Sequence, residues 1–171
     1  MSNTAQAAAP FTISRTFNAP RELVFAAWTE EEHLLKWFGP KGMPMTYAKS
    51  DPQPGGTMHY AMTTPDGSEL WGKWYYRDVR PPEYLELLAT FSDKDGNVTR
   101  NPWKAEWPLK TLSKTTFTEH DGKTTVTLEW SAFEATPEEQ AAFDDPQARA
   151  GMTGGWGGTF DKLDEYLAEI R

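Results

Sequence analysis

Apolar residues recur at every second position through much of residues 45–130 of this 171-residue chain. A period of two places alternate side chains on opposite faces of an extended strand, which is the pattern of strands with one buried face. Turn sequences such as Thr64-Pro65-Asp66-Gly67 and His120-Asp121-Gly122 separate the alternating segments. The sequence therefore predicts an antiparallel meander of about six strands, over residues 45–50, 57–62, 69–79, 84–91, 112–119 and 124–130.

The segment before the meander predicts one more strand and two short helices. Residues 11–17, FTISRTF, alternate strictly and place on one face Phe11, Ile13, Arg15 and Phe17. Because a guanidinium on an apolar face must find a carboxylate or open to a solvated cavity, Arg15 is of interest. We expect a first helix with Pro20 at its first position. A capping box over residues 29–32 predicts a second helix, which stops at Gly39-Pro40.

The last segment predicts a long helix that contains five glycines. One helical stripe runs through them without a break, formed by Met152, Trp156, Phe160, Leu163, Leu167 and Ile170. We therefore favour one helix of about 25 residues from Pro146 over a loop followed by a helix from Thr159. Glycines cost roughly 0.5 to 1 kcal/mol each relative to alanine inside a helix. Close approach of a neighbouring backbone, or a functional need for a helix that opens locally, would offset this cost. We expect four of the glycines to face away from the stripe: Gly151, Gly154, Gly155 and Gly158.

A further helix start is predicted at Thr136-Pro137-Glu138-Glu139, where the N-cap, the proline and the third-position acid all fit.

Charge and composition exclude several classes of partner. The formal net charge is -8, so we expect neither nucleic acid nor an anionic membrane surface as a partner. The chain has no cysteine, which removes disulfides and thiolate metal sites. Residues 1–10 lack the basic start and apolar run of a signal peptide. We expect a soluble, cytoplasmic protein with a disordered tail over residues 1–10 and a single domain over residues 11–171.

Sequence motifs for nucleotide, metal or hydrolytic chemistry are absent. The glycine-rich GGWGGTF lacks the Gly-Lys-Ser/Thr ending and the preceding strand of a phosphate-binding loop, and no HExxH or GxSxG occurs. The histidines, His33, His59 and His120, stand at no metal-ligand spacing. Only His59 falls within an expected strand, on the face opposite Met58 and Tyr60. We therefore expect no metal and no cofactor, and we assign no catalytic residue.

Several stretches of the chain together resemble one family. They are RTFNAPRELVFAAWTEEEHLLKWFGP (15–40), DPQPGG (51–56), YYRDVRPPEYL (75–85), TTFTEHDGKTTVTLEW (115–130) and GGWGGTFDKLDEYL (154–167). They are similar to the family named for activators of the ATPase of heat-shock protein 90 (AHSA-type), which belongs to the SRPBCC superfamily of START-like and Bet v-like proteins. The resemblance covers nearly all of the chain after residue 10. It departs at Trp37-Phe38, where relatives often carry two tryptophans, and in a long loop over residues 92–108.

The resemblance implies the helix-grip fold. In this α+β fold a curved antiparallel sheet of about seven strands wraps around a long C-terminal helix, and two short helices follow strand 1. It also implies a hydrophobic cavity between sheet and helix. If the cavity wall follows the assigned faces, we expect its ligand-binding lining to comprise Arg15, Met58, Tyr60, Met62, Trp156 and Phe160. These are also ordinary core residue types, and Arg15 would either hold an anionic ligand group or pair with a structural acid.

The leading hypothesis for function is binding of a small apolar or amphipathic molecule in this cavity. Two alternatives stay open. One is an enzyme of cyclase or hydratase type, in which Arg15, His59 or Tyr60 polarises a carbonyl. The other is a chaperone-interacting module that works through its outer surface. As partners, a chaperone and a second copy of the chain, forming a homodimer, stay open as well.

Overall fold

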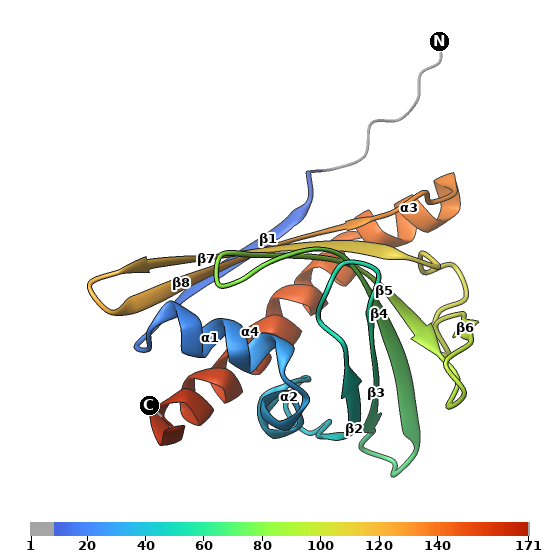
Figure 1. Cartoon of the computed structure of the whole chain (residues 1–171). Coiled ribbons are helices and arrows are strands. Elements are labelled where there is room, and N and C mark those ends of the chain that lie inside the picture. Colours follow the sequence, from blue (N-terminus) through green and yellow to red (C-terminus); the bar gives the residue numbers. More distant parts are fainter. Residues whose placement is uncertain (1–8, 171) are drawn as a thin grey trace.

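The computed structural model describes residues 9–170, in which helices pack against one curved antiparallel sheet (Figure 1). Most of the tail predicted to be disordered, residues 1–8, lies outside the described residues. Within the described range the strands are β1 (Phe11–Phe17), β2 (Met45–Ser50), β3 (Thr57–Thr63), β4 (Glu69–Arg80), β5 (Tyr84–Ser92), β6 (Val98–Thr99), β7 (Thr111–His120) and β8 (Lys123–Ala132). The predicted first strand and meander are confirmed, and the short β6 is the strand that the sequence pattern did not indicate.

The sheet has the strand order β1-β8-β7-β5-β4-β3-β2, with β6 beside β5. The helices are α1 (Arg21–Thr29), α2 (Glu31–Trp37), α3 (Pro137–Asp144) and α4 (Pro146–Ile170). Figure 1 shows α4 running along the concave side of the sheet, with α1 and α2 beside it. This arrangement is the helix-grip fold, as predicted. No helix within residues 9–170 is both long enough and apolar enough to span a membrane.

The long helix is confirmed and includes all five glycines. It begins after Asp145, whose carboxylate accepts hydrogen bonds from the backbone N–H groups of Gln147 (3.0 Å) and Ala148 (3.2 Å). Along the predicted stripe Met152, Phe160, Leu163 and Leu167 are buried and Trp156 is half-buried. Ile170, in the last turn, is 37% exposed, so the buried stripe ends at Leu167, three residues earlier than expected.

Two predicted helix starts differ from the structure. Pro20 precedes α1 as its N-cap instead of occupying its first position. The capping box expected over residues 29–32 is wrong, because Thr29 is the last residue of α1 and its hydroxyl donates to the Phe25 carbonyl oxygen at 2.9 Å. The box at α3 is confirmed: the Glu139 N–H donates to the Thr136 hydroxyl, and the Thr136 N–H donates to the Glu139 carboxylate, both at 3.1 Å.

The core consists of two clusters of apolar side chains along α4. The larger cluster packs α1, α2 and the second half of α4 against the sheet, and it includes Trp28, Phe38 and Phe160. The smaller cluster lies near α3 and includes Phe11, Phe143 and Met152, with Trp107 and Trp130 packed against it. Trp156 packs against both clusters. The region where the two clusters meet is therefore bounded by large rings on several sides.

Candidate functional site

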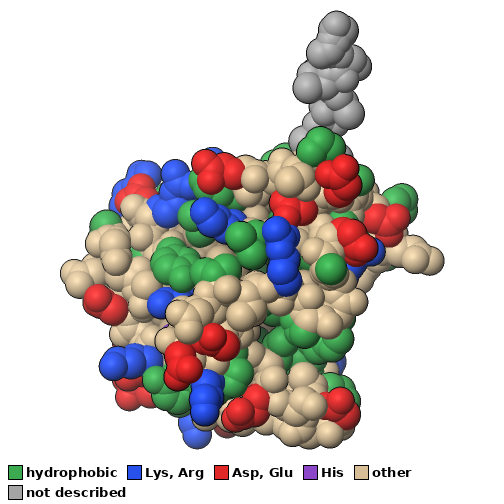
Figure 2. All heavy atoms as spheres, turned by 90° about the vertical axis from the view of Figure 1, so that its right-hand side faces the viewer, with side chains coloured by type: hydrophobic (Ala, Val, Ile, Leu, Met, Phe, Trp, Pro, Cys, Tyr) green, Lys and Arg blue, Asp and Glu red, His purple; other side chains and the backbone are tan. Residues whose placement is uncertain are grey.

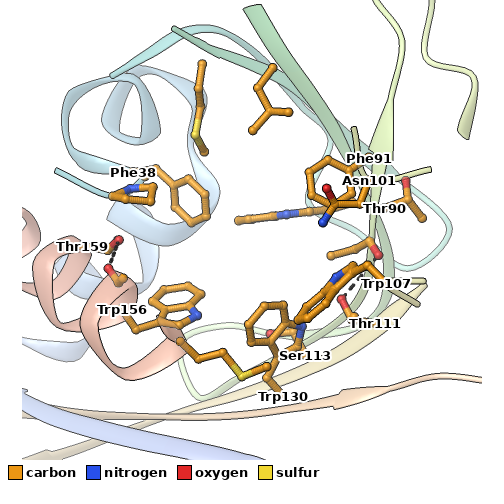
Figure 3. A pocket seen from close by; sticks show the side chains of 18 of the residues that line it. Phe38, Thr90, Phe91, Asn101, Trp107, Thr111, Ser113, Trp130, Trp156 and Thr159 are labelled. Carbon is orange, nitrogen blue, oxygen red and sulfur yellow. Dashed lines mark hydrogen bonds between the residues drawn. The ribbon is translucent and has the colours of Figure 1, made fainter. Parts of the chain in front are cut away.

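A cavity of about 500 Å³ lies between the sheet and the first half of α4 (Figure 3). Its wall is predominantly apolar and carries nine aromatic side chains: Trp28, Phe38, Tyr60, Trp74, Phe91, Trp103, Trp107, Trp130 and Trp156. Three lining residues are exposed to solvent, namely Trp103, Lys104 and Gly151. We call the opening at these three residues the mouth. Hydrophobic side chains are exposed between charged ones on the molecular face that carries β6 (Figure 2).

The sheet side of the wall is built by strand alternation. Every second residue of a strand faces the helix, so β5 contributes Leu85, Leu87, Ala89 and Phe91, and β7 contributes Thr111, Ser113 and Thr115. On β3, Tyr60 lies opposite Gly72 of β4. A Cβ atom at residue 72 would lie 2.4 Å from the Tyr60 hydroxyl oxygen, closer than atoms can approach. The missing side chain of Gly72 therefore provides the space in which the Tyr60 ring lies.

The helix side of the wall contains two of the glycines. Gly151 and Gly155 line the cavity, which corrects the expectation that they face away from it. A Cβ atom at either position would meet no other group within 4 Å. Close approach of another backbone therefore does not explain these two glycines. The helical stripe could not reveal this, because a residue without a side chain gives no polarity signal at the border of the apolar face.

Most polar side chains of the lining gather on one side of the cavity, and Thr159 lies on the other side, beside Phe38 and Trp156. Figure 3 shows Thr90, Asn101, Thr111 and Ser113 on the side opposite Phe38 and Trp156. The hydroxyls of Thr90 and Thr111 donate to backbone carbonyl oxygens of neighbouring strands, at 3.3 and 3.5 Å. The cavity thus has an apolar side and a side that can form hydrogen bonds, which suits an amphipathic molecule.

The titratable side chains of the lining are Tyr60 and Lys104, and the described lining contains no aspartate, glutamate or histidine. Burial raises the pKa of the Tyr60 phenol to about 12, with a smaller opposing effect from a hydrogen bond with Trp74. The phenol therefore keeps its proton at neutral pH. The indole N–H of Trp28 is buried and has no hydrogen-bond partner among the described residues.

Of the six lining residues expected from sequence, the structure brings three together. Tyr60, Met62 and Trp156 line the cavity. Met58 and Phe160 are fully buried in the larger core cluster and are not part of the wall. They lie on the assigned faces, but other side chains cover them, and a strand pattern does not show how far along the sheet a cavity extends.

Arg15, the sixth expected residue, is also not part of the wall. Its guanidinium donates to the Asp161 carboxylate at 2.7 Å and to the Gly157 carbonyl oxygen at 3.4 Å. It also lies over the Phe160 ring, 5.7 Å from the centroid. Lys41 contacts the same carboxylate at 3.1 Å. Of the two expectations for Arg15, pairing with a structural acid is the one that the geometry supports.

His59 lies away from the cavity and packs beside Trp71 and Tyr47, at ring-centroid distances of 4.9 and 5.9 Å. Its position on the face opposite Met58 and Tyr60 follows the strand alternation. The residues 9–170 contain no group of three or more histidines, cysteines, aspartates or glutamates that could hold a metal ion.

Sequence reasoning missed the part of the wall formed by residues 101–109 and by β7 and β8. This part includes Asn101, Trp107 and Trp130. The available signal was the density of tryptophan and proline in NPWKAEWPLK, since rings of that size need a surface to pack on. The signal does not state which surface, because residues 101–110 lack regular secondary structure to fix their direction.

Comparison with known proteins gives one family. The model of the family described as activator of Hsp90 ATPase homolog 1-like protein matches residues 18–168. No curated protein sequence matches the chain.

Solved structures from several bacteria are similar to this one. Protein Ms6760 from Mycobacterium smegmatis is 27% identical over 95% of this chain and 96% of its own, with a TM-score of 0.74. A protein from Arthrobacter aurescens is 28% identical over 92% of this chain and 85% of its own, with a TM-score of 0.76. The AHSA1 protein from Silicibacter pomeroyi, 19% identical over 95% of this chain and 100% of its own with a TM-score of 0.71, shows the fold alone.

Proposed function

The chain belongs to the activator of Hsp90 ATPase homolog 1-like family, and from this premise and the geometry of its cavity we propose that it binds a small apolar or amphipathic molecule between the sheet and α4. The observation that carries the proposal is the cavity of about 500 Å³ with its aromatic wall. Small-molecule sites in proteins are clefts of roughly 300 to 1,000 Å³ with apolar walls and a few placed polar groups. The volume and the lining both agree with this class.

The glycines of α4 support the same function. Filling the space beside Gly155 with a side chain would lower the cost of glycine in the helix without a steric clash. The sequence instead keeps the helix surface bare at the two positions, Gly151 and Gly155, that border the cavity. A bare helix surface enlarges the space available to a ligand and leaves the mouth open beside Gly151.

Binding of the fluorescent probe N-phenyl-1-naphthylamine tests the proposal. The fluorescence of this neutral, apolar amine rises when it leaves water, so a titration of the whole protein is expected to show saturable binding at one site. Gly155→Leu places a side chain in the cavity, and we expect it to weaken binding at least about tenfold because it removes space that the probe occupies.

Gly154→Leu is the matched control. Gly154 is exposed, does not line the cavity and, like Gly155, has open space where a Cβ would lie. Both variants gain the same helix propensity, so only the direction of the side chain differs. Saturable binding that weakens in Gly155→Leu and persists in Gly154→Leu supports the proposal. No saturable binding, or equal binding by both variants, contradicts it.

A further inference from the structure

The orientation of the Asn101 amide is fixed by its own turn. Its oxygen Oδ1 accepts hydrogen bonds from the backbone N–H groups of Trp103 (2.8 Å) and Lys104 (3.1 Å). A side-chain nitrogen cannot accept these bonds, so the NH₂ group must be the other end of the amide. Figure 3 shows Asn101 at the edge of the cavity, with its nitrogen towards the interior. This NH₂ group forms no hydrogen bond with the described residues and is available as a donor to a ligand.

Lys104 adds a positive charge at the same place. It lines the mouth, is exposed and forms no ion pair within residues 9–170. The neighbouring cation Arg100 is already paired with Glu139, and Glu106 does not line the cavity. Because the lining contains no carboxylate, Lys104 gives it a positive formal charge, although the whole chain carries -8.

The tryptophan side chains of the wall add no hydrogen-bond acceptor to the cavity, because an indole has one N–H and no acceptor. The Thr159 hydroxyl donates its hydrogen bond to the Gly155 carbonyl oxygen at 2.9 Å, so it is not available as a donor to a ligand. The free Asn101 NH₂ donor and the Lys104 cation therefore favour a group that accepts hydrogen bonds and carries negative charge.

We propose that the ligand of this cavity is an amphipathic carboxylate, with its anionic end at the mouth on Asn101 and Lys104 and its apolar body among the aromatic rings. The proposal rests on the function proposed above and adds the chemistry of the polar end. A neutral amide of the same shape has one acceptor oxygen instead of two and no negative charge, so its interaction with the Asn101 donor and the Lys104 cation is weaker. The site therefore discriminates between a carboxylate and a carboxamide.

The test uses a pair of competitors that differ only in this group. Naphthalene-2-carboxylate and naphthalene-2-carboxamide are used separately to displace N-phenyl-1-naphthylamine from the whole protein at neutral pH and low salt. We expect the carboxylate to compete at a concentration about tenfold lower than the carboxamide, because a charge-assisted hydrogen bond to a partly buried donor is worth at least that factor.

Asn101→Asp is the decisive variant. An aspartate accepts the same two backbone hydrogen bonds, so the turn is retained, but the donor becomes an acceptor with negative charge. We expect the apparent affinity for the carboxylate to fall about tenfold or more, and that for the carboxamide to change less than about threefold. Lys104→Gln is expected to weaken carboxylate binding about two- to fivefold, as for an exposed charge. Gln147→Glu and Lys94→Gln, exposed residues outside the lining, make the same charge changes and are expected to have no effect.

The outcomes separate the two proposals. If the amine binds but the two competitors act equally, or if Asn101→Asp weakens both competitors alike, the carboxylate proposal is wrong and the binding function stands. If the amine does not bind, both fail. If Asn101→Asp and Gln147→Glu lower the apparent affinity for the carboxylate equally, the effect comes from the overall charge of the protein and not from a contact at the mouth. This result also overturns the proposal.

Discussion

The indole of Trp156 on α4 lies nearly parallel to that of Trp28 on α1, with their ring centroids 5.9 Å apart and an angle of 11° between their planes. Trp156 also contacts the ring of Phe38, just after α2, edge-on at 6.1 Å. The same side chain lines the cavity. One ring therefore joins the long helix to the segment of the two short helices and at the same time forms part of the cavity wall.

We predict that Trp156→Ala lowers the free energy of unfolding by about 2 to 3 kcal/mol. This lies at or below the lower end of the usual range for tryptophan, because the cavity side of the ring has no protein contacts to lose. Urea unfolding followed by circular dichroism measures the change. Trp103→Ala removes a ring that is 65% exposed and should cost less than about 0.5 kcal/mol. A loss below about 1 kcal/mol for Trp156→Ala would contradict the packing described here.

The contact between Tyr60 and Gly72 predicts an energetic coupling. Gly72→Ala places a Cβ 2.4 Å from the Tyr60 hydroxyl oxygen, so the ring must move, and we expect a loss of about 1 to 3 kcal/mol. In a Tyr60→Ala background the obstacle is absent, and Gly72→Ala should then cost much less. A double-mutant cycle by urea unfolding measures the coupling. Additive losses would mean that the clash is relieved without the ring.

Most of the fold could be predicted from local patterns because the strands other than β6, and the long helix, each have their own signal. The alternation in FTISRTF and TTVTLEW and the unbroken stripe from Met152 to Leu167 survive in the structure as β1, β8 and α4. The local sequence predicted the structure less well where one side chain can form either of two hydrogen bonds. Thr29 has the side chain of an N-cap, but its hydroxyl donates backwards within α1, to the Phe25 carbonyl oxygen.

The cavity wall could be predicted only in part, because its boundary depends on tertiary packing. Alternation identified the face of Met58, Tyr60 and Met62, but the position of the cavity along β3 depends on which side chains cover that strand. Asn101 lies in a segment without regular secondary structure, and its amide direction follows from a turn that sequence alone does not place against the sheet. The hydrophobic periodicity of the sequence therefore could not indicate that the Asn101 NH₂ group lies at the cavity.

Glu139 links α3 to the start of the segment that carries Asn101, and we predict a pH-dependent effect of its removal. The Arg100 guanidinium, with a smaller contribution from the Thr136 N–H, lowers the pKa of the Glu139 carboxyl below its ordinary value of 4.5. Because the pKa is lowered on folding, the pair stabilises the protein above pH 4.5 and this contribution is lost as pH falls through the lowered pKa. Glu139→Gln should cost about 1 kcal/mol at neutral pH, discounted because Arg100 is half exposed.

The measurement is urea unfolding of both proteins at neutral pH and at about pH 3. Glutamine can still accept the Thr136 N–H, so the capping box is retained and only the charge is lost. Glu138→Gln, an exposed neighbour in the same helix turn, is the control and should show little change at either pH. A difference between Glu139→Gln and the original protein that is the same at both pH values would rule out the ion pair as its source.

A substitution at Gly154 tests directly whether the first half of α4 unfolds locally. A Cβ at this exposed position would meet no other group within 4 Å, so Gly154→Ala should raise the free energy of unfolding by about 0.5 to 1 kcal/mol. Gly158→Ala should gain less, because its Cβ would lie 3.3 Å from the Lys41 side chain.

Thermal and urea unfolding give the size of this gain, and hydrogen exchange of the amides of residues 151–158 shows where it arises. If this half of α4 stays helical in the folded protein, the gain appears in global unfolding and these amides exchange slowly before and after the substitution. If instead it opens locally, these amides exchange rapidly in the original protein, and Gly154→Ala slows their exchange because it stabilises the helical form against local opening as well as against global unfolding. The second result would mean that the glycines keep the helix locally unstable beside the cavity mouth.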